Sequence, residues 1–219
     1  MTLTLVLMAV LMGGIALWLF RQSLHVQPWV AESGPGRSVP APMTAPRTGL
    51  GVFLAVVTSV FSLTISAYLM RREMGADWRS LTMPGVIWVN SALLVLASLA
   101  LQLAWRAAGH GQEGRLWRAL LAGGGLTLAF VAGQCVAWVR LEAAGYYLAA
   151  NPANAFFYLL TVLHALHLLG GLVAWGRVLV RARGGTPAVQ LRPSVELCAL
   201  YWHFLLLVWG VILGLVLAT

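Results

Sequence analysis

Long apolar runs separated by short polar links make up most of the chain. A helix that crosses the hydrocarbon core of a bilayer needs about 20 predominantly apolar residues. Six runs are long enough, and we predict a transmembrane helix for each: Thr2 to Phe20, Gly49 to Met70, Met83 to Trp105, Leu116 to Trp138, Phe156 to Val180 and Val195 to Leu217. The pattern therefore predicts an all-α integral membrane protein with six transmembrane helices.

The link after the first run is longer than the others and lacks a hydrophobic period. It holds five of the nine prolines: Pro28, Pro35, Pro40, Pro42 and Pro46. Such composition is typical of an extended linker. We predict an extra N-terminal transmembrane helix over 1–20, a Pro-rich cytoplasmic linker over 21–47 and a five-helix core over 48–219. The first run lacks the basic region that opens a signal peptide, so we expect it to be retained.

Composition excludes a water-soluble globule. Charged residues are 9% of the 219 residues and hydrophobic ones 60%, with a mean hydropathy of +0.85, whereas soluble domains carry roughly a quarter charged residues. All 14 basic residues are arginines, and the formal net charge is +8. On a soluble protein this excess would favour nucleic-acid binding. Here the arginines lie mostly in the links, so they indicate membrane topology and no nucleic-acid partner.

The arginines divide unequally between the two sides of the membrane. One side carries ten: Arg21, Arg37, Arg47, Arg106, Arg115, Arg118, Arg177, Arg181, Arg183 and Arg192. The other side carries four: Arg71, Arg72, Arg79 and Arg140. Because cytoplasmic links carry the excess of positive charge, the first set is predicted to be cytoplasmic. Six spans then place both termini on the outer side.

The ionisable groups restrict the chemistry that the chain can perform. All six acids lie in links or at span ends: Glu32, Glu73, Asp77, Glu113, Glu142 and Glu196. A proton relay needs carboxylates at membrane depth, so we expect none within this chain. The sequence also contains no nucleophile elbow, P-loop, HExxH or CxxC motif. These absences predict a non-catalytic subunit.

Three histidines lie within about 6 Å of the membrane midplane, given the rise of a helix: His164, His167 and His203. One interpretation is axial ligation of haem by His203 with His164 or His167. The other is hydrogen bonding between closely packed helices, helped by Gly170 and Gly171. The same role between helices is expected for four further polar residues, Asn90, Ser91, Ser98 and Gln134.

Two motifs resemble a known family. The span from Phe156 to Gly171 contains an HxxHxxxG pattern, and the last span contains YWHF over Tyr201 to Phe204, followed by Trp209. Together they resemble subunit III of the haem–copper oxidases, over about residues 48 to 218. The third span is similar to the family's P…NT…SS helix. The helix-packing motif would comprise Asn90, Ser91, Ser98, Gln134, His164, His167, Gly171, Tyr201, Trp202, His203 and Trp209.

The resemblance implies a non-catalytic subunit III of a terminal oxidase in the bacterial inner membrane. Its partners would be a catalytic subunit I that holds haems and copper, and a subunit II that handles copper or quinol. This chain would hold no cofactor or metal, would support subunit I and could bind phospholipid. The resemblance gives the core the same orientation as the arginine count. The alternatives are a stand-alone di-histidine haem cytochrome and an accessory subunit of a nitric oxide reductase.

The sequence departs from the family at two acidic positions. The family's core helix carries a membrane-embedded glutamate after a serine, where this chain has Thr58 and Ser59. A second glutamate, often found three residues after the glutamine matching Gln134, is replaced by Ala137. The influence on proton uptake that is attributed to those acids is therefore not expected here.

Overall fold

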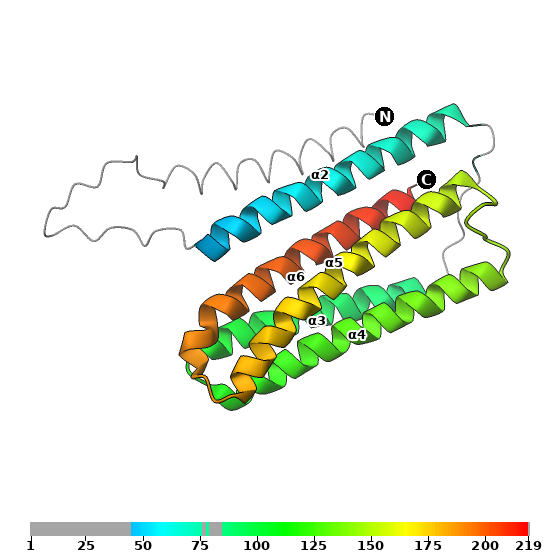
Figure 1. Cartoon of the computed structure of the whole chain (residues 1–219). Coiled ribbons are helices and arrows are strands. Elements are labelled where there is room, and N and C mark those ends of the chain that lie inside the picture. The colour runs from blue at the N-terminus through cyan, green and yellow to red at the C-terminus, as the bar shows by residue number, and fades with distance from the viewer. Residues whose placement is uncertain (1–44, 76–77, 79–84, 219) are drawn as a thin grey trace, which may run out of the picture. The chain divides into compact units, whose positions relative to one another are not determined.

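The computed structural model describes residues 45–75, 78 and 85–218. This part of the chain forms five helices, α2 (Ala45–Met74), α3 (Val86–Gly109), α4 (Glu113–Ala143), α5 (Pro152–Arg183) and α6 (Ala188–Leu217) (Figure 1). All five are long and apolar enough to cross a membrane, which confirms the all-helical membrane architecture. The predicted first helix over 1–20 and nearly all of the predicted linker lie outside the described residues.

The helices extend beyond the predicted apolar runs at nearly every described end. The largest difference is at α6, which begins at Ala188 and continues through Pro193, whereas the predicted span began at Val195. Proline removes one backbone hydrogen bond, to the carbonyl four residues earlier. That carbonyl belongs to Val189, whose side chain is 59% exposed, so water can satisfy it near the helix start. The polar stretch therefore continues the helix, where the sequence predicted a link.

The chain divides into two compact units, residues 1–62 and 63–219. The described part of the first unit is the first half of α2. Two hydroxyls in it bond to carbonyls one turn earlier: Thr58 Oγ1 donates to Leu54 at 2.8 Å and Ser59 Oγ donates to Ala55 at 3.0 Å. A hydroxyl paired in this way within its own helix is tolerated in hydrocarbon.

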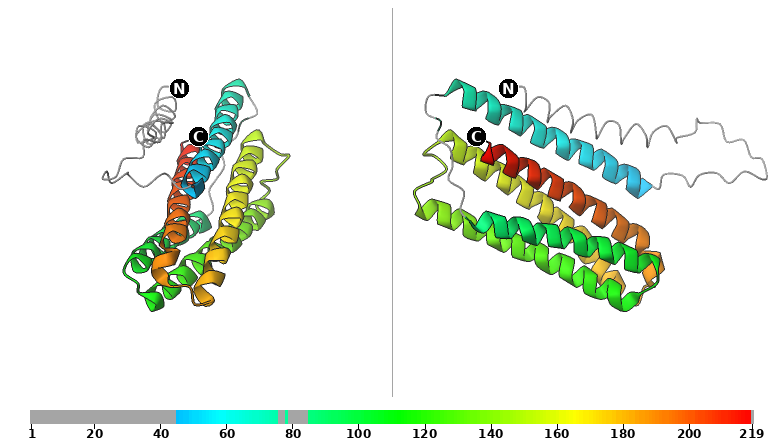
Figure 2. Two further views of the ribbon diagram at one scale, coloured as in Figure 1. Left: turned by 60° about the vertical axis from the view of Figure 1, so that its left-hand side comes forward. Right: turned by 180° about the vertical axis from the view of Figure 1, so that it is seen from behind.

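In the second unit α3 to α6 form a four-helix bundle. Helix α3 contacts α4 and α6, and α5 contacts the same two helices, as the views in Figure 1 and Figure 2 show. Residues 110–112 join α3 to α4 and residues 184–187 join α5 to α6. Links this short make consecutive helices antiparallel neighbours, so both links lie at the same end of the bundle.

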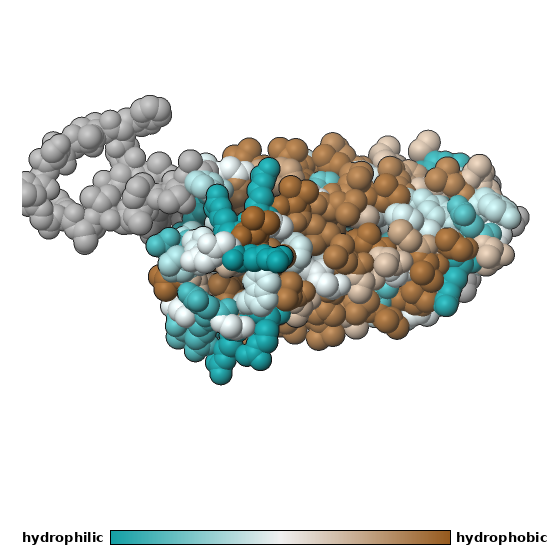
Figure 3. Space-filling view, turned by 60° about the horizontal axis from the view of Figure 1, so that its bottom comes forward, coloured by the Kyte–Doolittle hydropathy of each residue, from teal (hydrophilic) through white to brown (hydrophobic). Residues whose placement is uncertain are grey.

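Apolar side chains cover the outside of the bundle as well as its inside. Leu94, Leu160 and Leu205 are fully buried, whereas Val139 is 65% exposed and Val180 is 71% exposed. Figure 3 shows a broad apolar belt across the middle of one face, with hydrophilic side chains at its ends. An outward apolar surface of this kind suits hydrocarbon and not water.

Candidate functional site

The imidazole of His203 links α6 to α3 through two side-chain partners. Its Nδ1 bonds to the hydroxyl of Ser98, and its Nε2 lies 3.0 Å from Oε1 of Gln102. A neutral imidazole offers one donor and one acceptor. The arrangement fits a neutral ring whose Nε2–H donates to Gln102 and whose Nδ1 accepts from Ser98. Both ring nitrogens are therefore engaged in contacts between helices.

A second set of polar contacts joins three helices. Trp209 of α6 donates from Nε1 to the Ser91 hydroxyl of α3 at 2.9 Å, and Ser91 donates in turn to the carbonyl of Ile87 at 2.8 Å. Asn90 Nδ2 of α3 donates to Gln134 Oε1 of α4 at 3.4 Å. Asn90 and Gln134 are each 1% exposed. These bonds replace the water that the membrane interior lacks.

His164 is held by aromatic rings. Its side chain is 1% exposed, and within the described residues neither ring nitrogen has a hydrogen-bond partner. The ring centroid lies 5.3 Å from the centroid of Trp209 and 5.9 Å from that of Phe130. His164 thus joins α5 to α4 and α6 through packing, unlike His203.

The last polar set joins α5 and α4 to the YWHF segment. Tyr201 Oη donates to the carbonyl of His167 at 2.9 Å, and Nδ1 of His167 lies 2.7 Å from the carbonyl of Leu163. A Cβ at Gly171 would lie 2.6 Å from Cε1 of Tyr201, so only glycine permits this approach. Trp202 Nε1 donates to Thr127 Oγ1 at 2.9 Å.

The structure brings most of the sequence-predicted residues together across helix interfaces, but it gives two histidines other contacts than the predicted hydrogen bonds between helices. Within the described residues His164 has no hydrogen-bond partner, and Nδ1 of His167 lies beside a carbonyl of its own helix. Gly170 is the exception among the groups expected to help, because a Cβ there would meet nothing within 4 Å. The sequence interpretation missed Gln102 and Thr127, the partners of His203 and Trp202. Polar residues within apolar runs were the available signal for both.

The glycine run in α4 was also missed. The ring of Trp175 occupies the place that a Cβ at Gly124 would take, and its Nε1 donates to the carbonyl of Leu120 at 3.0 Å. Three consecutive glycines, Gly123 to Gly125, inside a helix are an available signal of close helix approach.

Metal-ligating groups are scattered through the described helices. Within residues 45–75, 78 and 85–218, no group of three or more His, Cys, Asp or Glu is arranged to hold a metal ion. A histidine pair could still bind haem axially. The deep imidazoles are instead packed against other helices, as the contacts of His203 and His164 show.

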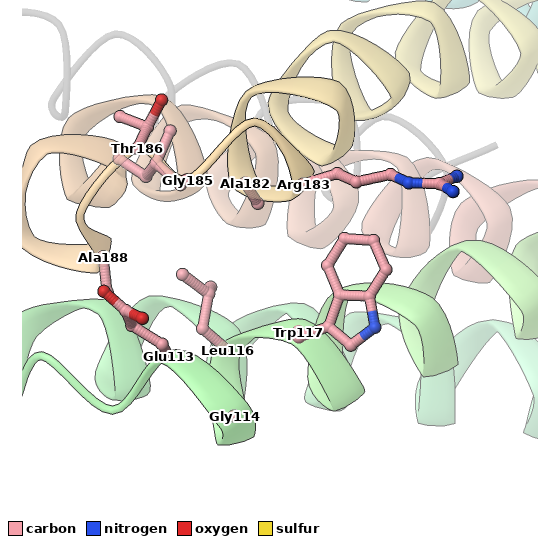
Figure 4. Close-up of a pocket in the computed structure, with 10 residues that line it drawn as sticks. Glu113, Gly114, Leu116, Trp117, Ala182, Arg183, Gly185, Thr186 and Ala188 are labelled. Atoms are coloured by element: carbon pink, nitrogen blue, oxygen red, sulfur yellow. The ribbon is translucent and has the colours of Figure 1, made fainter.

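A surface hollow lies at the end of the bundle that carries both short links. Its volume is about 410 Å³, and Glu113, Trp117, Arg183 and Thr186 are among its lining residues. In Figure 4 Trp117 projects from α4, and Arg183 extends from the facing end of α5. The hollow combines one acid, one base, one hydroxyl and an indole.

Comparison with known proteins places the chain in a family. No protein-family model matches the sequence. However, the chain is 32% identical over 180 residues to Cytochrome c oxidase subunit 3 of Synechocystis sp., covering 77% of this chain and 73% of the relative. The chain belongs to the cytochrome c oxidase subunit 3 family. The resemblance drawn from the HxxHxxxG and YWHF motifs is thereby confirmed.

Two further relatives agree with this family membership. Cytochrome c oxidase subunit 3 of Thermostichus vulcanus is 28% identical, with 76% of this chain and 84% of the relative covered. Heme-copper oxidase subunit I+III of Aeropyrum pernix is 25% identical over 92% of this chain, which corresponds to 26% of that longer relative. The subunit 3 match thus extends over most of the chain.

Proposed function

We propose that this chain is the non-catalytic subunit III of a bacterial haem–copper terminal oxidase. Electrons would reduce oxygen in subunit I, which holds the haems and copper, while subunit II handles copper or quinol. This chain would support subunit I, hold phospholipid and bind no redox centre itself. The activity of the complex would be aerobic respiration coupled to proton translocation.

One observation carries the proposal: in this member of the subunit 3 family, most deep polar groups bond to other helices, and His164 is packed between aromatic rings. Both nitrogens of His203 are engaged by α3, and the YWHF tyrosine and tryptophan bond to α5 and α4. An axial haem ligand needs a free imidazole nitrogen with room for the iron beside it. His203 has no free ring nitrogen, and the ring of His164, whose nitrogens are unbonded, is 1% exposed and packed against Phe130 and Trp209. The observed contacts favour a packing role for these residues over the alternative of a di-histidine cytochrome.

Family names support the choice of partner. The Aeropyrum pernix relative is named for subunits I and III together. A name that joins the two subunits favours an association between this chain and a subunit I. We extend the same inference to subunit II, which would complete the complex.

The arginines of the described bundle favour the orientation predicted from sequence. Seven lie at or near the end with the two short links: Arg106, Arg115, Arg118, Arg177, Arg181, Arg183 and Arg192. One lies towards the opposite end of the bundle, Arg140 in the last turn of α4. Positive charge accumulates on the cytoplasmic side, so the short links would face the cytoplasm and the C-terminus the periplasm.

Affinity purification through a tag on this chain tests the proposal. We expect a copper-containing oxidase to be recovered from mild detergent, with haem bands that belong to a second polypeptide. Recovery of a nitric oxide reductase instead would show that this chain is an accessory subunit of that enzyme. Recovery of the chain alone, from cells that express the oxidase, would contradict the proposal.

A further inference from the structure

A second, larger hollow lies along the hairpin of α3 and α4. Its volume is about 700 Å³, and its apolar wall includes Leu103 from α3 and Ala119 and Ala122 from α4. The three-residue link brings the last turns of α3 beside the first turns of α4. Alanine side chains leave space between the helices there, so an apolar trough opens on the surface of the protein.

Three arginines line the same hollow close to the link. Arg106 lies in the last turn of α3, and Arg115 and Arg118 lie one turn apart near the start of α4. Arg115 donates to the amide oxygen of Gln112 at 3.0 Å, and Arg118 donates to the carbonyl of Gly114 at 3.3 Å. Both bonds are to uncharged groups, and no carboxylate lines the hollow. Its positive charge is therefore available to an anion.

The charged and apolar parts follow each other along the membrane normal. Ala100 lies six residues before Arg106, and Ala122 lies four residues after Arg118, which corresponds to about 6–9 Å of helix length towards the bundle centre. Figure 3 shows the same order on one face of the protein, with hydrophilic side chains at the ends of the apolar belt. The hollow thus has a cationic mouth and an apolar interior.

We infer that this hollow binds one anionic phospholipid, with its phosphate on the three arginines and the upper part of an acyl chain along the alanines. Guanidinium groups bind phosphate oxygens through paired N–H donors. A zwitterionic lipid brings an ammonium group that the arginines repel, and free phosphate leaves the apolar trough unfilled. The inference rests on the proposed function, in which this chain holds phospholipid. It adds where the lipid binds, in the hollow of α3 and α4, and that its headgroup is anionic.

A charge series tests the headgroup contacts. The full chain is purified, delipidated in detergent and titrated with phosphatidylglycerol, phosphatidylcholine or inorganic phosphate. We expect phosphatidylglycerol to bind most tightly, and the variant R106Q/R115Q/R118Q to lose about tenfold or more in its affinity. The control R177Q/R181Q/R183Q removes the same charge at the same end of the bundle and should bind as the parent chain does.

A shape pair tests the trough without changing charge. Ala122→Phe fills the hollow, whereas Leu121→Phe enlarges an exposed neighbour on the same turn that does not line it. Only Ala122→Phe should weaken phosphatidylglycerol binding. Circular dichroism and gel filtration establish that each variant is folded before it is titrated.

Three outcomes would overturn the inference. These are equal losses in the two arginine variants, no loss in R106Q/R115Q/R118Q, and phosphate binding as tight as that of the lipid. Since the titration uses the isolated chain, its result is separate from recovery of an oxidase. If the purification recovers an oxidase but R106Q/R115Q/R118Q binds phosphatidylglycerol as tightly as the parent chain, only the lipid site is contradicted. If R106Q/R115Q/R118Q loses lipid affinity but the purification recovers no oxidase, only the proposed complex is contradicted.

Discussion

In the interior of the bundle, polar side chains bond to one another across helices, whereas at the end with the short links the arginines point outward. His203 bonds to two residues of α3, and Trp202 donates to Thr127 of α4. At the short-link end, Arg106 and Arg115 are exposed. Most polar side chains of the interior are thus engaged by other helices, whereas these arginines are exposed at the surface.

The difference follows from the solvent that surrounds each region. In hydrocarbon a polar group has no water to bond, so a partner within its own helix or on a neighbouring helix stabilises it. At the interface water and lipid phosphates bond to exposed guanidinium groups, and protein partners are unnecessary. Polar residues therefore hold the fold in the interior and are available for binding at the basic end.

The largest expected effect comes from removing the central tryptophan of the interior. Trp202 is fully buried and donates to Thr127. Trp202→Ala leaves a cavity and removes one of the two hydrogen bonds of the Thr127 hydroxyl, and should lower the free energy of unfolding by about 3–5 kcal/mol. Unfolding of the full chain in mixed detergent micelles measures this. Trp88→Ala, at a position 58% exposed, is the control, and equal losses would show that Trp202 does not anchor the core.

A smaller effect is expected where helix α4 approaches a tryptophan. Gly124→Ala places a methyl group where the ring of Trp175 lies, and such overpacking costs about 1–3 kcal/mol. The neighbouring Gly125→Ala meets nothing within 4 Å and removes a flexible glycine from a helix, so it should be neutral or stabilising. The same unfolding assay compares the two. A stable Gly124→Ala protein would mean that Trp175 packs elsewhere.

Two of the deep histidines, His203 and His164, can be compared with each other, because only His203 is hydrogen-bonded to other helices. His203→Phe removes two bonds to α3 and should lower the free energy of unfolding by about 0.6–2 kcal/mol. His164→Phe removes no bond within the described residues and keeps a ring beside Trp209, so its effect should be smaller. In a Ser98→Ala background the effect of His203→Phe should shrink. Independent effects of Ser98→Ala and His203→Phe would contradict the bond between these two residues.

The smallest expected effect is the absence of a reaction. A hydrophobic carbodiimide modifies carboxyl groups that stay protonated in apolar surroundings. Position 137 is a fully buried alanine, and position 59 is a serine whose hydroxyl bonds within its helix. Peptide mapping should therefore find no adduct within the spans of this chain. An adduct on Glu196, in the third turn of α6, would place that carboxyl deeper in the membrane than we expect.

The five described spans could be predicted because each apolar run is long enough and ends in polar residues. The early start of α6 could not, since Gln190, Arg192 and Pro193 are equally compatible with a link. The partners of the deep polar groups were also beyond the sequence. In a membrane bundle the lipid-facing and inward sides of a helix are both apolar. The hydrophobic pattern of α3 therefore does not show that Ser98 and Gln102 both face α6.

The central claim is that the deep histidines pack helices and that this chain carries no redox centre. An absorption spectrum of the full chain, purified without partner subunits from haem-replete cells, tests it most directly. We predict a colourless protein with no Soret band, and the same result for His203→Phe. A Soret band that disappears in His203→Phe or His164→Leu would contradict the claim and would make the chain a di-histidine cytochrome.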